Sequence, residues 1–185
     1  MRDKYEMQLR KLHAEMIEMG TMIEQAIETA IKALVAQDTE LAKKAIEADD
    51  AIDHQEREIE NLCLKLFLTQ QPVAGDMRNI SAALKMITDM ERIGDHASDI
   101  SELTLCMAGT PYIKKLEHVQ QMAKETIVML VSSIEAYVNA DEKKAKSVIA
   151  HDDVVDGLFD TIKNELIAMI HDNPDDGEQA CDLLM

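Results

Sequence analysis

The sequence predicts an all-α protein made of long antiparallel helices in two tandem three-helix repeats. Three observations lead to this prediction. Aromatic residues make up only 3% of the chain, and six glycines and three prolines in 185 residues leave few interruptions to helical segments. Apolar residues recur at alternating steps of three and four, as in helix bundles. A stretch of the first half also recurs in the second half.

The first two predicted helices cover residues 9–34 and about 40–70. The first carries a regular apolar seam, and it ends where Asp38 or Thr39 can cap the second. The inward residues predicted for the second helix are Leu41, Ala45, Ala48, Ile52, Ile59, Leu62 and Leu66.

Each proline marks the predicted start of a later helix, since a first helical turn does not need the missing N–H group. The third helix is expected to run from Pro72 to Gly109. A fifth helix starts within "NADEKKA", after the fourth ends near Asn139. The predicted caps and first-turn prolines of the fourth and sixth helices are Thr110 with Pro111 and Asn173 with Pro174.

An internal repeat divides the chain. Residues 33–61 align with residues 136–164, and the identical pairs include Asp49 with Asp152 and Asp53 with Asp156. The repeat predicts two units, residues 1–109 and residues 110–185. The counterpart of "TDMERIGDHASDI" would begin just after Met185, so we expect a shortened or naturally truncated second repeat that is incomplete at its C-terminus.

The chain is strongly acidic, with 36 acidic against 19 basic residues and a formal net charge of −17. Such a chain repels the phosphates of nucleic acids, so we exclude nucleic-acid binding. The excess acid fits cation binding, docking on basic protein surfaces, or simply a solvated surface.

Cysteine usage and hydropathy indicate a cytoplasmic protein. Cys63, Cys106 and Cys181 are odd in number and far apart, which predicts core thiols in a reducing compartment instead of disulfides or a zinc site. No apolar run approaches 18 residues, and the N-terminus lacks a signal-peptide core. Any contact with a membrane is therefore expected to be indirect, through partner proteins.

Four carboxylates are predicted to face each other across the second and third helices. Asp49 and Asp95 are each 23 positions from Pro72, and Asp53 and Glu91 are each 19 positions from it. Because both helices of an antiparallel hairpin rise equally per residue, the two pairs should lie level. Converging carboxylates repel unless protons or cations intervene, and such oxygen ligands suit Mg²⁺, Mn²⁺, Ca²⁺ or iron, with room for bridging more than one ion.

Several neighbours are less certain members of this site. Asp89 and Asp99 lie near the patch, and His96 is either a ligand, a hydrogen-bond partner of a carboxylate, or an exposed polar histidine. Gly94 is either a point of close helix approach or a tolerated glycine. The repeat adds Asp152 and Asp156 as a second pair, whose expected partners would follow Met185.

The stretches "ADDAIDHQEREIE", "LFLTQQPVAGDMRNI", "DMERIGDHASDI", "HDDVVD" and "IHDNPDDGEQACDLL" together resemble the PhoU family across essentially the whole chain. The resemblance implies two three-helix repeats with paired E/DxxxD motifs that bind multinuclear metal clusters, mostly iron, with Mg²⁺, Mn²⁺ or Zn²⁺ as alternatives. The ligands that it implies here are Asp49, Asp53, Glu91, Asp95, Asp152 and Asp156.

The function implied by this resemblance is regulatory. Family members relay the state of the phosphate ABC transporter to the PhoR sensor kinase, which represses the phosphate regulon and uptake when phosphate is abundant. The implied partners are PhoR, the transporter ATPase and a second copy of the chain.

Two other classes compete with this reading. One is a ferritin-like di-metal oxidoreductase or iron-handling bundle, but such sites use Glu-x-x-His spacing, and no glutamate here is followed three residues later by histidine. Because the sequence also lacks a P-loop and a G-x-S-x-G elbow, we expect no enzyme. The other class is an interaction bundle whose acids only solvate it.

Overall fold

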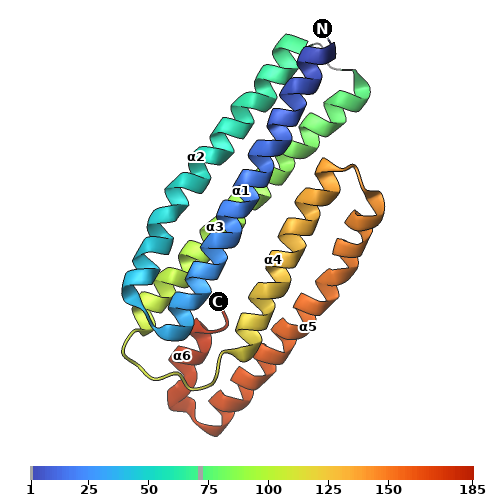
Figure 1. Cartoon of the computed structure of the whole chain (residues 1–185). Helices are drawn as coiled ribbons and strands as arrows, with labels where there is room; N and C mark the ends of the chain where they lie inside the picture. Colours follow the sequence, from blue (N-terminus) through green and yellow to red (C-terminus); the bar gives the residue numbers. More distant parts are fainter. Residues whose placement is uncertain (1, 71–72) are drawn as a thin grey trace.

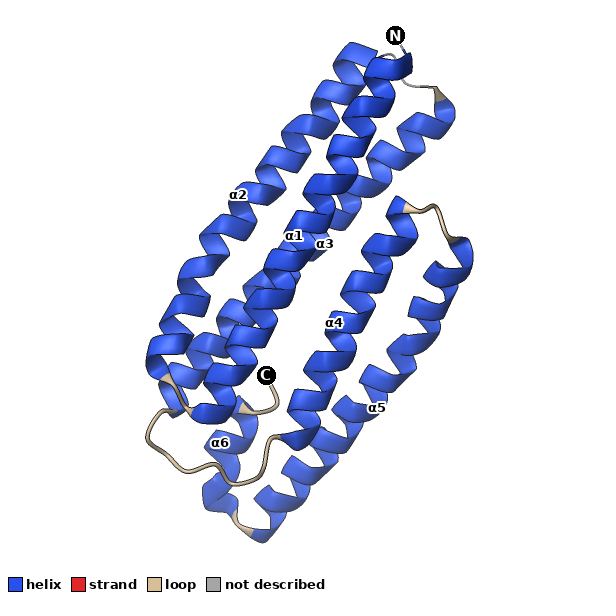
Figure 2. Cartoon of the chain, in the orientation of Figure 1, coloured by secondary structure: helices blue, strands red, loops and turns tan. Residues whose placement is uncertain are grey.

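The computed structural model describes residues 2–70 and 73–185, and every regular element in that part of the chain is helical (Figures 1 and 2). The predicted all-α class is therefore confirmed. The elements are α1 (Arg2–Ala36), α2 (Thr39–Gln70), α3 (Ala74–Met107), α4 (Glu117–Val138), α5 (Glu142–Asp172), the 3₁₀ helix η1 (Pro174–Asp176) and α6 (Gly177–Asp182). The predicted helix start at Pro72 lies outside the described residues.

The helices α1, α2 and α3 pack against one another as a long bundle (Figure 1). The predicted seam of α1 is confirmed, since Leu12, Met16, Met19 and Ile23 are fully buried and Leu9 packs at the edge of the core. On α2 the prediction for Ala48 is wrong, because that residue is exposed. The inward path from Ala45 to Ile52 passes through half-buried Asp49 instead, which places a carboxylate beside the core.

The α4–α5 hairpin lies beside this bundle, and α4 packs on α1 (Figure 1). Leu130 and Ile134 of α4 belong to the same buried cluster as the core of the first bundle. One close approach is at Gly20 of α1, where an added Cβ would lie 2.3 Å from Cδ1 of Ile134. The absence of a side chain at residue 20 therefore lets the second helical unit rest directly on the first.

The α1–α2 and α4–α5 turns have the same geometry, as the repeat predicts. Gln37 and Ala140, which are equivalent in the repeat, both adopt a φ of 50°, the first directly after α1 and the second two residues after the end of α4. Each turn closes with the two backbone hydrogen bonds of a Schellman motif, from the following aspartate N–H to the carbonyl five residues back and from the positive-φ residue to the carbonyl three residues back. Those aspartates, Asp38 and Asp141, then cap the next helix through their side chains.

The predicted start of the fourth helix at Thr110 and Pro111 is wrong, because α4 begins at Glu117 and residues 108–116 form an irregular connection. Two glutamines satisfy the backbone of this segment. Gln37 donates from Nε2 to the carbonyl oxygens of Met107 and Thr110, at 3.1 and 2.7 Å. Gln179 accepts from the N–H of Ile113 and donates to the carbonyl of Pro111. With these partners the segment needs no helical hydrogen bonds.

The predicted cap at Asn173 and first-turn proline at Pro174 open the 3₁₀ helix η1, whereas the short α6 itself begins three residues later, at Gly177. The Asn173 side chain accepts a hydrogen bond from the Asp175 N–H, and Pro174 opens the 3₁₀ turn that leads into α6. The predicted boundary between residues 109 and 110 falls inside the irregular connection; the division into two domains stays a prediction.

The prediction of three core thiols is only partly right. Cys63 is fully buried in the first bundle, and burial raises the pKa of its thiol to about 11. Cys106 and Cys181 are exposed, because they lie on the outer faces of α3 and α6. All three are free thiols. Among the described residues, no helix is both long and apolar enough to cross a membrane.

The contact at Gly20 predicts the effect of a larger side chain. Gly20→Leu should destabilise the protein by about 1–3 kcal/mol, because the added side chain must displace Ile134 in a packed interface. The matched control is Gly157→Leu on α5, where an added Cβ meets nothing within 4 Å, and where better helix propensity should stabilise by about 0.5–1 kcal/mol. Urea denaturation measures the change in the free energy of unfolding for each variant. Equal changes for the two substitutions would contradict a packed contact at Gly20.

Candidate metal centre

Three of the predicted carboxylates converge between α2 and α3. Asp49, Asp53 and Asp95 each offer an oxygen, and these atoms all lie within 4.8 Å of one another. All three residues are half-buried. We call these residues the carboxylate triad.

The sequence positions of the triad follow from the pairing of α2 with α3. Gly94 is buried, and a Cβ added there would lie 3.1 Å from two carbon atoms of Ile52 and 3.5 Å from Oδ1 of Asp49. The predicted close approach of the two helices at Gly94 is therefore observed. It fixes the level of α3 against α2, so that Asp95 faces the Asp49 turn.

Asp49 is the most unusual member of the triad. Its Oδ1 atom is buried and has no hydrogen-bond partner among the described residues. Burial raises the pKa of its carboxyl group above the usual value, and the neighbouring carboxylates of Asp95 and Asp53 raise it further. A buried acceptor without a donor is costly, so this oxygen is available to a proton or a cation.

Glu91 lies next to the triad and not within it. Burial raises the pKa of its carboxyl group, followed by repulsion from Asp95 and from Glu56. Sequence reasoning missed Glu56, whose pKa is raised by burial and by Glu60 and lowered by a hydrogen bond from Thr88. The signal was present: Glu56 and Thr88 are equally distant from position 72, which is the register that relates Asp53 to Glu91.

The other predicted neighbours form exposed side-chain contacts with residues outside the triad. Asp89 lies 3.9 Å from a guanidinium nitrogen of Arg92, and Asp99 lies 3.5 Å from Nδ1 of His96. The structure therefore brings none of Asp89, His96 and Asp99 into the triad.

The second predicted pair, Asp152 and Asp156, is exposed on α5. Asp152 borders a cavity of about 370 Å³ between α3, α4 and α5, which Asp89 also borders. Within residues 2–70 and 73–185, neither aspartate joins a group of three close potential ligands.

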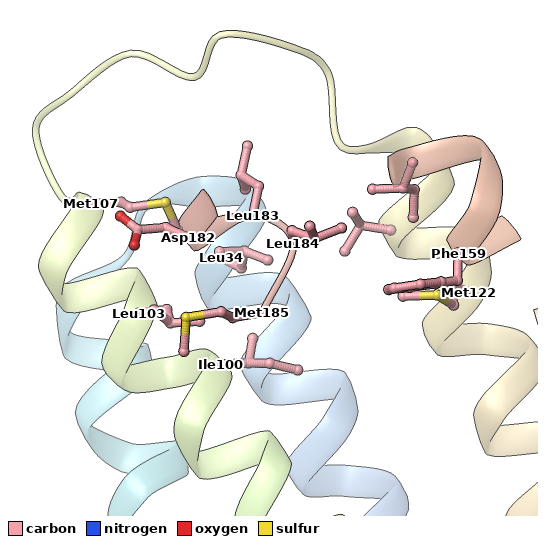
Figure 3. Close-up of a pocket in the computed structure, with 12 residues that line it drawn as sticks. Leu34, Ile100, Leu103, Met107, Met122, Phe159, Asp182, Leu183, Leu184 and Met185 are labelled. Atoms are coloured by element: carbon pink, nitrogen blue, oxygen red, sulfur yellow. The ribbon is translucent and has the colours of Figure 1, made fainter. Parts of the chain in front are cut away.

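A second cavity, of about 140 Å³, lies where the C-terminal residues meet both helical units (Figure 3). Leu103 and Met107 of α3, Met122 of α4 and Phe159 of α5 line it with Leu183 and other apolar residues (Figure 3). Asp182 is the one ionisable residue among its lining residues. This cavity is therefore a region of apolar packing and not a candidate cation site.

The donor chemistry of the triad fits a hard cation. Its ligands are carboxylate oxygens only, including one buried oxygen without a partner, and such donors are preferred by Mg²⁺, Mn²⁺, Ca²⁺ and iron ions. A bound cation would neutralise the mutual repulsion of the carboxylates and tie α2 to α3.

The family model described as "PhoU domain" matches residues 16–104 and 119–185. The chain belongs to the PhoU family. The two matched segments are separated by the connection that the structure shows before α4, and they cover both helical units.

Curated PhoU relatives and solved PhoU structures agree with this assignment. The chain is 38% identical to a phosphate-specific transport system accessory protein PhoU homolog of Clostridium acetobutylicum, over 91% of this chain and 78% of the relative. It is 34% identical to the homolog of Aquifex aeolicus, over 90% of this chain and 76% of that protein. The crystal structure of PhoU from Pseudomonas aeruginosa superposes with a TM-score of 0.91 at 26% identity, covering 97% of this chain and 87% of the other.

Membership also decides the class of function. PhoU proteins are accessory or regulatory proteins of phosphate transport and not enzymes, so this chain is an accessory protein of that kind. The ferritin-like oxidoreductase is thereby set aside.

The repulsion within the triad predicts the effect of neutralising Asp49. In cation-free protein at neutral pH, Asp49→Asn should stabilise by a few tenths to about 1 kcal/mol, because it removes a like charge and supplies amide donors to Asp53 or Asp95. Native protein, whose Asp49 pKa is raised on folding, loses stability as pH rises through that pKa. The advantage of the variant should therefore shrink as the pH falls and Asp49 takes up a proton.

Urea denaturation with a chelator present measures this difference across pH. Asp50→Asn is the control, since Asp50 is exposed on the same turn and outside the triad. A destabilised Asp49→Asn at neutral pH would contradict the account of the buried oxygen.

Proposed function

We propose that this protein is a metal-binding regulatory adaptor of phosphate homeostasis. It couples the phosphate ABC transporter to the PhoR sensor kinase, and it represses the phosphate regulon and phosphate uptake when phosphate is abundant. The carboxylate triad with its unpartnered buried oxygen is the observation that carries the metal-binding part. The membership in a family of phosphate-transport accessory proteins supports the regulatory part.

The proposed ligands start from the triad and extend to Glu91. Asp49, Asp53 and Asp95 offer converging oxygens, and Glu91 is close enough to repel Asp95. Iron in a multinuclear cluster is the proposed metal, because carboxylates suit it and can bridge two ions. Asp152 and Asp156 are proposed as a second, weaker pair, since they lack a converging third ligand among the described residues.

The proposed mode of action is a protein–protein relay at the cytoplasmic side of the transporter. Three free cysteines that are far apart in sequence fit a reducing compartment. We further propose that the chain acts as a homodimer, which light scattering of the purified protein tests.

Metal binding predicts a difference between the two aspartate pairs. Mn²⁺ or Fe²⁺ should raise the melting temperature of native protein by mass action. At a free ion concentration a hundredfold above Kd, binding adds about 2.7 kcal/mol to the free energy of unfolding. Asp49→Asn with Asp53→Asn should lose most of this effect. The matched control, Asp152→Asn with Asp156→Asn, changes the same residue types at the same spacing on α5 and should keep most of it.

Elemental analysis after mild purification checks the same point directly. No bound metal and no uptake on titration would refute the metal-binding part, and equal losses in the two double variants would remove the special role of the triad.

The regulatory part predicts two physical partners. Immobilised protein should retain the transporter ATPase and PhoR from membranes of phosphate-replete cells, and less of one or both from starved cells. An unrelated helical protein of similar net charge controls for unspecific binding to the acidic surface. Retention of neither partner in either condition would contradict the relay.

A further inference from the structure

One carboxylate of the triad already pairs with a positively charged side chain of the protein. The guanidinium group of Arg57 donates from Nη2 to Oδ2 of Asp53, at 3.2 Å. The two residues are four positions apart on α2, so the pair lies along one face of that helix.

This pair is singular among the contacts of the triad. Among residues 5–68 and 73–185, whose side chains the structure describes, Arg57 is the one basic residue whose side chain forms an ion pair with Asp49, Asp53 or Asp95. The charges that act on Asp49 are all neighbouring carboxylates. Arg57 therefore provides the one direct neutralising contact that the triad has from within the described chain.

The Arg57–Asp53 ion pair is weak and separates at a low cost in free energy. The Arg57 side chain is 66% exposed, and with the described residues it forms one hydrogen bond, the bond to Asp53. A pair at this helical spacing with an exposed arginine and a half-buried aspartate holds its geometry only weakly, because both side chains lose freedom and water screens the charge of the arginine. A positioning residue, by contrast, would be held by a second contact.

A hard cation and this guanidinium would compete for the same carboxylate. A divalent ion among three carboxylates would gain from all three, whereas Arg57 gains from one. An arginine side chain that stayed on Asp53 would also repel the ion.

We propose that Arg57 is an intramolecular competitor of the cation: it occupies Asp53 in the cation-free protein and must leave Asp53 when a divalent cation binds the triad. The inference rests on the proposed metal-binding function and adds a residue that sets how tightly the site binds. The guanidinium thus makes the empty triad tolerable and lowers its affinity for cations.

The test is a titration of the full chain with Mn²⁺, monitored by isothermal titration calorimetry. Arg57→Gln should bind Mn²⁺ about three- to tenfold more tightly than native protein, because the competing charge is gone. Arg57→Lys keeps the charge and should bind within about twofold of native. The difference in Mn²⁺ affinity between Arg57→Gln and native protein should shrink at high salt, where screening weakens the Arg57–Asp53 pair.

Arg92→Gln is the matched control. Arg92 is also 66% exposed, and it pairs at 3.9 Å with Asp89, which is outside the triad. Its loss removes the same charge from the same region without freeing a triad carboxylate, so binding should tighten by less than about twofold. Circular dichroism of the cation-free variants verifies that each is folded.

The outcomes separate the two proposals. If native protein binds Mn²⁺ and Arg57→Gln binds with equal or lower affinity, the competitor role is overturned and the metal site stands. If Arg57→Gln and Arg92→Gln tighten binding equally, the effect is general charge and the competitor role is again overturned. If neither native protein nor Arg57→Gln binds Mn²⁺, the metal-binding function fails and the competitor role fails with it.

Discussion

The contact between Gly94 of α3 and Ile52 of α2 is the constraint on which the carboxylate triad depends. Ile52 fills the space that a side chain at residue 94 would need, so α3 can neither rotate nor slide without opening a void or a clash. That contact also brings the backbone of α3 beside Asp49. A packing interaction in the core therefore holds like charges together at the surface, and the energy of burying Ile52 offsets their repulsion.

The position of Asp49 shows how closely core and site are joined. It lies on the inward path of α2 between two buried residues, Ala45 and Ile52, where a bundle helix normally carries an apolar residue. A polar group in such a place is stable only with a partner, and its buried Oδ1 atom lacks one among the described residues. The violation of the apolar pattern coincides with the place where the family resemblance puts a metal ligand, as expected of a functional position.

Much of this arrangement could be predicted from the sequence. The spacing of Asp49 and Asp53 before position 72, and of Glu91 and Asp95 after it, correctly predicts which turns of α2 and α3 face each other, because helical rise is constant. Counting along helices does not resolve the direction of a side chain. It therefore could not predict that Glu91 lies outside the triad or that Ala48 is exposed to solvent. The start of α4 was also predicted wrongly. Thr110 and Pro111 are favourable opening residues locally, but Gln37 and Gln179, which are 73 and 68 positions away in sequence, hold that segment in an irregular conformation.

The two interhelical turns of the repeat differ in what a change to glycine would cost. Gln37 and Ala140 hold the same left-handed backbone, which costs any residue other than glycine about 1 kcal/mol. At residue 140 a glycine would relieve that strain with no side-chain bond lost, whereas at residue 37 it would release the amide that ties the connection to α1. Two turns with the same left-handed residue thus differ in what they tolerate: residue 140 can accept glycine, whereas residue 37 needs its long amide side chain to hold the connection between the two helical units.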